Sequence, residues 1–97
     1  MFIHAVLFKI DSEEVKDYRK DSIMWARHAK KYSKGFVSYH TVKRAGVKNQ
    51  YVSVYRWKTR NHRDIFMKEF HDFLVSESKA KVKTLGHYNL KAIDEVS

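Results

Sequence analysis

The chain alternates between two hydrophobic periodicities, and their order constrains the fold more than any other feature. Helical spacing of apolar residues extends from the end of the first strand to about Tyr32, and a second helical stretch carries Phe73 and Leu74. Strand-like segments, rich in β-branched and aromatic residues, cover residues 2–10, 36–44, 50–57 and 81–93. The predicted order of elements is therefore β-α-β-β-α-β.

This order predicts a specific architecture. Right-handed crossovers place both helices on one face of a four-stranded antiparallel sheet, with the first strand in a central position. The predicted fold class is α+β and ferredoxin-like. No linker composition interrupts the sequence, so one domain spanning 1–97 is expected.

Local signals predict how the elements begin and bend. Asp11 offers an N-cap for the first helix, and Glu14, three residues later, completes the pattern of a capping box. Thr59 or Asn61 is expected to cap the second helix. Gly86 predicts a bulge or bend within the last strand.

The predicted sheet has one face that the helices do not cover. Both faces of the first strand are apolar. In the third strand Val52 and Val54 lie on one face, and the other face carries Tyr51, Ser53, Tyr55 and Trp57. An uncovered apolar sheet face needs a partner. A second copy of the chain is the simplest one, so we expect a homodimer through the sheet faces, a dimeric α/β barrel.

Composition removes several classes of protein. The 97 residues include no Cys, which excludes disulfides, thiolate zinc sites and cysteine nucleophiles. There is no secretory signal pattern and no apolar run of 18 residues. A cytoplasmic protein without membrane association is therefore expected.

The net charge of +9, from 20 Lys and Arg against 11 Asp and Glu, allows two interpretations. It is typical of a highly charged solvated surface, and it also permits an anion-binding face. KGFVSY (34–39) resembles the RNA-recognition-motif signature, but it falls on the second strand rather than the third. We therefore expect nucleic-acid binding to be weak and non-specific.

Two stretches resemble one superfamily. MFIHAVLFKI (1–10) resembles the opening strand of the stress-responsive dimeric α/β-barrel (Dabb) proteins, in which that strand carries a histidine. YVSVYRWKTRNHRDIFMKEFHDF (51–73) resembles the antibiotic biosynthesis monooxygenase (ABM) domain. The resemblance implies a dimer with a ligand pocket between sheet and helices in each subunit. It also implies oxidation of aromatic compounds without metal or flavin.

The resemblance also implies site residues. A pair of histidines that acts together in related cyclases maps onto His4 and His71, and a pocket-lining aromatic position maps onto Phe66. The haem-degrading relatives carry Asn near Val6 and Trp at Phe66, so haem chemistry is not implied here. No cofactor is expected, and no carboxylate, His or Cys spacing forms a metal site.

The predicted function is a cofactor-independent monooxygenase acting on an aromatic or quinone-like small molecule. His4 and His71 would transfer the proton. The expected substrate-binding aromatics are Tyr39, Tyr51, Trp57 and Phe66.

Several alternatives stay open. The same histidine pair suits a Dabb-like cyclase or lyase, and the chain could equally be a non-catalytic, stress-related ligand-binding module. His4 could be a core histidine with one hydrogen-bond partner, and His71 an exposed histidine at a helix end. The aromatic residues could serve packing alone.

Overall fold

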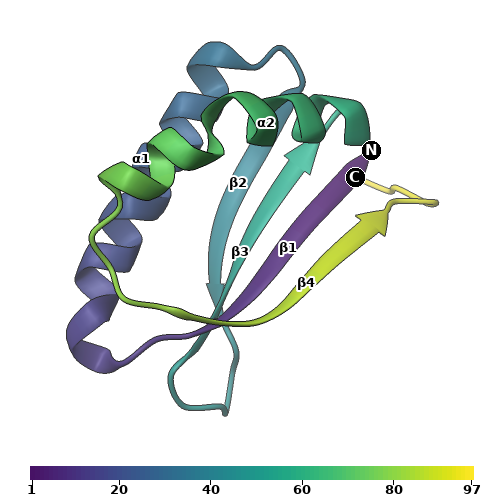
Figure 1. Ribbon diagram of the computed structural model, residues 1–97. Coiled ribbons are helices and arrows are strands. Elements are labelled where there is room, and N and C mark those ends of the chain that lie inside the picture. The colour runs from purple at the N-terminus through teal and green to yellow at the C-terminus, as the bar shows by residue number, and fades with distance from the viewer.

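The computed structural model describes residues 1–97 and has the predicted α+β architecture. The four strands form one antiparallel sheet in the order β2-β3-β1-β4, and both helices lie on one side of it (Figure 1). The elements are β1 (Phe2–Lys9), a 3₁₀ turn (Ser12–Glu14), α1 (Val15–Tyr32), β2 (Phe36–Lys43), β3 (Gln50–Trp57), α2 (Arg60–Glu77) and β4 (Lys83–Lys91).

The alternation of β3 decides which side chains meet the helices. Ser53, Tyr55 and Trp57 are buried, whereas the intervening residues are only partly so. The central strand β1 pairs with β3 so that His4 lies opposite Tyr55 and Val6 opposite Ser53. His4 therefore faces the helices.

The two helices begin differently from one another. Thr59 caps α2, because its Oγ1 accepts a hydrogen bond from the backbone N–H of His62 at 3.3 Å. The capping box predicted for the first helix is wrong. Asp11 makes no side-chain cap, and the Glu14 carboxylate instead accepts from the backbone N–H of Lys81 at 2.7 Å.

The core lies where the two helices pack against the C-terminal end of β3. Trp57, at 1% exposure, packs with Phe66 and Leu74 of α2 and with Ala29 of α1. Tyr32, at which the helical spacing predicted from the sequence ends, is half exposed at the end of α1. The buried stripe of α1 consists of Tyr18, Ser22 and Ala29.

The last strand, β4, has an irregularity next to Gly86, where the sequence predicts a bulge or bend. Leu7 pairs with Gly86 but Phe8 pairs with Thr84, so one extra residue bulges out of β4. On the face of the sheet away from the helices, Val42, Tyr88 and Leu90 are exposed. Neither helix is long and apolar enough to cross a membrane.

Candidate active site

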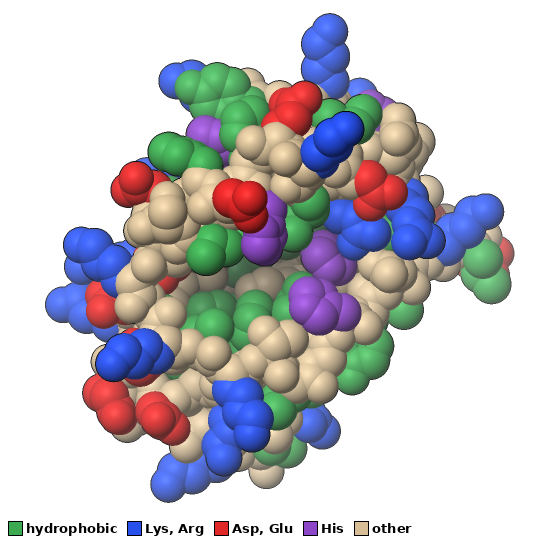
Figure 2. Space-filling view, in the orientation of Figure 1, with side chains coloured by type: hydrophobic (Ala, Val, Ile, Leu, Met, Phe, Trp, Pro, Cys, Tyr) green, Lys and Arg blue, Asp and Glu red, His purple; other side chains and the backbone are tan.

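A cavity of about 530 Å³ lies between the sheet and the two helices. Its floor comes from the helix-facing side chains of β1 and β3, and its walls from α1, α2 and the α2–β4 connection (residues 78–82). Figure 2 shows it as a hollow with hydrophobic side chains inside and histidines gathered along one edge. Most lining residues are apolar or aromatic, which suits an organic ligand of modest size.

His4 belongs to β1, and its side chain lines the floor of the cavity. It is 9% exposed, and its ring makes no hydrogen bond with any other residue of the chain. Burial lowers the pKa of the His4 imidazole to about 4, and the nearby Arg63 and His87 act in the same direction. The ring is therefore neutral at pH 7 and keeps both nitrogens available to a ligand.

Arg63 explains part of this environment. It is buried at 8% exposure on the first turns of α2, and its Nη1 donates to Asn89 Oδ1 at 2.9 Å. Its Nε donates to the Asp64 carboxylate at 2.7 Å, and its guanidinium lies 4.9 Å from the centre of the Phe2 ring. This cation ties α2 to β4 close to His4.

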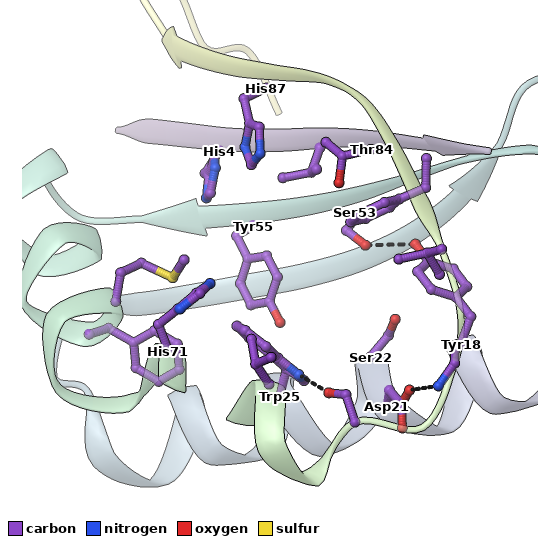
Figure 3. Close-up of a pocket in the computed structure, with 18 of the residues that line it drawn as sticks. His4, Tyr18, Asp21, Ser22, Trp25, Ser53, Tyr55, His71, Thr84 and His87 are labelled. Carbon is purple, nitrogen blue, oxygen red and sulfur yellow. Dashed lines mark hydrogen bonds between the residues drawn. The ribbon is translucent and has the colours of Figure 1, made fainter. Parts of the chain in front are cut away.

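His71 reaches the same cavity from α2. Its Nδ1 lies 3.2 Å from an Asp72 carboxylate oxygen, and its ring packs edge-on against Trp25 with 5.9 Å between centroids. The side chain is about half exposed, so it stands at the cavity mouth. The structure thus brings the predicted pair, His4 and His71, to one cavity (Figure 3).

The four predicted aromatic residues divide into two pairs. Trp57 and Phe66 line the cavity. Tyr39 and Tyr51 do not; they line a second, open groove between α1 and β2. The ring of Tyr18 contacts Tyr51 on one side, at 6.0 Å, and the cavity residue Phe8 on the other, at 5.7 Å. It thus forms the wall between cavity and groove.

Solved structures with this architecture are numerous, although no protein-family model and no curated protein matches the sequence. One antibiotic biosynthesis monooxygenase superposes with a TM-score of 0.68 at 13% identity, covering 97% of this chain and 100% of the other. SnoaB of Streptomyces nogalater, a cofactor-independent oxygenase, gives a TM-score of 0.72 at 14% identity, covering 98% and 95%. The chain has the fold of the antibiotic biosynthesis monooxygenases. MhuD of Mycobacterium tuberculosis, a haem degrader with two haems in its active site, gives a TM-score of 0.73 at 12% identity, with both chains fully covered.

At these identities the likeness to ABM proteins establishes the fold, and function must be argued from the site.

The site contains a third histidine that the sequence did not single out. His87 of β4 stacks on His4 with 5.8 Å between ring centroids and lines the same cavity. Its position opposite Val6 follows from strand alternation, but only once the bulge in β4 is known. No group of three His, Asp or Glu residues is arranged to hold a metal ion.

The end of the cavity away from these histidines carries hydroxyl groups, which the sequence also did not single out. Tyr18 and Ser53 are hydrogen-bonded at 2.6 Å, and Figure 3 shows them across the cavity from His4 and His87. The Tyr55 hydroxyl has no hydrogen-bond partner within the chain and points into the space between. Burial raises the pKa of Tyr18 to about 12 and raises that of Tyr55 further, so both stay protonated.

The α2–β4 connection closes one side of the site through contacts with α1. The Asp21 carboxylate accepts from the backbone N–H groups of Lys79 and Ala80, at 2.9 and 2.8 Å. The indole Nε1 of Trp25 donates to Ser78 Oγ at 2.9 Å. Asp21 and Trp25 of α1 thereby fix a loop that lines the cavity.

The low pKa of His4 predicts a pH dependence of stability. As the pH falls from about 6.5 to about 4, the unfolded chain binds a proton at this ring before the folded chain does. The free energy of unfolding should therefore decrease in this window, by about 1–2 kcal/mol given that solvent can enter the cavity. Urea unfolding at pH 7 and pH 4.5 measures the difference.

A substitution isolates the contribution of His4. His4→Gln should remove that part of the pH dependence, whereas Lys68→Gln, at an exposed position of α2 outside the cavity, should leave it unchanged. Equal pH dependence in the wild type and in His4→Gln would show that the His4 ring is not held neutral by its surroundings.

Proposed function

We propose that this protein is a cofactor-independent oxygenase acting on an aromatic or quinone-like small molecule that carries an acidic proton. The observation that carries the proposal is the His4 ring, which is buried in an apolar cavity without any hydrogen-bond partner and shares that cavity with His71. Both ring nitrogens of His4 are therefore free to bind a ligand in this cavity. The ABM fold adds support from relatives of that chemistry.

The roles of the two histidines follow from their surroundings. Asp72 holds Nδ1 of His71, which leaves Nε2 as the free base at the cavity mouth. His4, neutral at pH 7, hydrogen-bonds an oxygen of the substrate and fixes its orientation. Trp57 and Phe66 supply flat apolar walls for the ring system.

The reaction balances with O₂ as the only oxidant. His71 removes a proton from an activated CH₂ group of the substrate, and the electron pair left on carbon reduces O₂ to a bound peroxide. Loss of water then leaves a ketone, so that R₂CH₂ and O₂ become R₂C=O and H₂O. Metal and flavin are not required because the substrate carbanion itself is the reductant.

Haem is not proposed as a ligand. The haem-degrading proteins of the superfamily that the sequence resembles carry Asn near the position of Val6 and Trp at the position of Phe66.

The test is oxygen uptake with a panel of electron-rich ring compounds. Naphthols, dihydroxynaphthalenes and tricyclic ketones with an acidic CH₂ group should be screened in an oxygen electrode, with product mass gain read from ¹⁸O₂. Incorporation of one ¹⁸O atom per turnover supports the proposal. Conversion of a polyketone at the same rate without O₂ would favour the cyclase or lyase, and tight binding without conversion would favour a binding module.

We also propose that the active form is a homodimer through the outer sheet face. Val42, Tyr88 and Leu90 expose apolar surface there. Leu90→Asp should dissociate the dimer, because it introduces a charge into the buried face. Sedimentation velocity at micromolar concentration measures the change.

The chain offers a matched control for this experiment. Ile65 of α2 has the same exposure as Leu90, 47%, but lies on the helix surface. Ile65→Asp should stay dimeric. A wild-type protein that remains monomeric at these concentrations, or equal behaviour of the two variants, would contradict the sheet-face dimer.

A further inference from the structure

Four hydroxyl groups form a continuous hydrogen-bonded chain across the sheet (the hydroxyl chain). Tyr18 and Ser53 are joined at 2.6 Å, the Tyr39 hydroxyl donates to Ser53 Oγ at 3.4 Å, and Tyr39 and Thr41 are joined at 2.5 Å. The members come from α1, β3 and β2. Hydroxyls suit such a chain because each can donate one hydrogen bond and accept others.

The hydroxyl chain connects two separate surfaces of the protein. Tyr18 and Ser53 line the cavity that holds His4 and His71. Tyr39 and Thr41 line the open groove between α1 and β2, and their contact is solvent-exposed. A path of hydroxyl groups therefore runs from the end of the cavity opposite the histidines to bulk water on another side of the molecule.

The direction of the hydrogen bonds is consistent along the chain. Because Tyr39 donates its only hydroxyl hydrogen to Ser53, its oxygen must accept from Thr41. Ser53 can then donate to Tyr18, and the Tyr18 hydrogen is free to be donated into the cavity. The raised pKa of Tyr18, about 12, keeps this hydrogen in place at neutral pH.

We infer that Tyr18 is the proton donor at the end of the cavity opposite the histidines, and that Ser53, Tyr39 and Thr41 resupply its proton from the groove. This inference rests on the proposed oxygenase function for its purpose, since a bound peroxide anion needs a proton. It assigns acid and base to opposite ends of one site. His71, half exposed at the mouth, returns its proton to solvent directly.

The transfer balances at every atom. The peroxide anion takes the Tyr18 hydrogen, Tyr18 takes that of Ser53, Ser53 that of Tyr39, Tyr39 that of Thr41, and Thr41 takes one from water. One O–H bond breaks and one forms at each hydroxyl, so no charge stays on the chain. Tyr18 is catalytic because it touches the reacting oxygen, whereas the other three are positioning residues.

The first experiment needs no substrate. The exchange rate of the Tyr18 hydroxyl hydrogen with solvent can be read by NMR from the deuterium isotope shift on its Cζ carbon, in equal parts H₂O and D₂O, with the cavity filled by 2-naphthol. Tyr39→Phe and Ser53→Ala should slow this exchange at least tenfold. Tyr51→Phe, which removes a hydroxyl from the same groove but outside the chain, should leave it unchanged. Unchanged exchange in all three variants would overturn the relay.

The second experiment uses turnover and separates the two proposals. Tyr39→Phe should lower kcat about tenfold or more with KM nearly constant, and should enlarge the solvent deuterium isotope effect. Tyr32→Phe, an exposed tyrosine of α1, is the control. If the histidine variants lose activity while Tyr39→Phe matches Tyr32→Phe in rate and isotope effect, the relay is wrong and the oxygenase stands. If the wild type turns over no substrate, the oxygenase fails, and the exchange measurement still decides the relay.

Discussion

Replacing His71 with Ala should lower the turnover rate by ~10²–10⁴, the range expected for loss of a general base. The side chain is about half exposed and its polar contact is with the exposed Asp72, so the fold should survive the change. His4→Ala should lower the rate by a similar factor, because the neutral ring that orients the substrate is lost. Oxygen uptake and thermal unfolding of both variants, measured together, check the prediction.

The design separates catalysis from structure. Lys68→Ala removes an exposed side chain of α2 that does not line the cavity, and should change neither rate nor stability. Asp72→Asn should reduce the rate less than His71→Ala, because the His71 base remains and only the carboxylate that orients its ring is lost. A His4→Ala variant that is less stable but equally active per folded molecule would show that His4 serves the core alone.

The fold could be predicted because its information is local. The alternation of β3 fixed which face meets the helices, and the crossover rule then placed both helices over His4. The capping box failed for the opposite reason. Glu14 bonds to the backbone of Lys81, 67 positions away, and no local pattern reports such a partner.

The site could be predicted only in part. His4 and His71 were both identified as site residues through the resemblance to known proteins, and strand alternation adds only that His4 shares a face with Val6. His87 was missed because the bulge in β4 changes which residues face the cavity: Thr84 and His87 both line it although an even alternation would separate them. A glycine predicts a bulge but not the new register.

Tyr39 and Tyr51 show a second limit. Both project from the helix-facing side of the sheet, yet both lie outside the cavity. The ring of Tyr18 separates them from it, and the position of α1 over the sheet decides this. Alternation assigns a face, whereas the division of that face into cavity and groove depends on helix packing.

Trp57→Ala should destabilise the protein by about 3–5 kcal/mol, as expected for truncating a fully buried large aromatic side chain. The indole stacks on Tyr55 with 5.9 Å between ring centroids, meets Phe66 at 5.3 Å and Phe36 at 6.0 Å, and thus joins three elements. In a domain of this size such a loss lowers Tm by more than about 12 °C. Urea unfolding followed by circular dichroism measures it.

Trp57→Phe should be much milder, and the reason lies in one atom. The indole Nε1 is buried and has no hydrogen-bond partner, so its N–H was removed from water without compensation. Phe keeps most of the ring contacts and removes that unpaired group, so its smaller volume is partly offset and the loss should stay below about 1.5 kcal/mol. A loss as large as that of Trp57→Ala would mean that the N–H has a partner in solution, such as a water molecule held in the cavity that Trp57 lines.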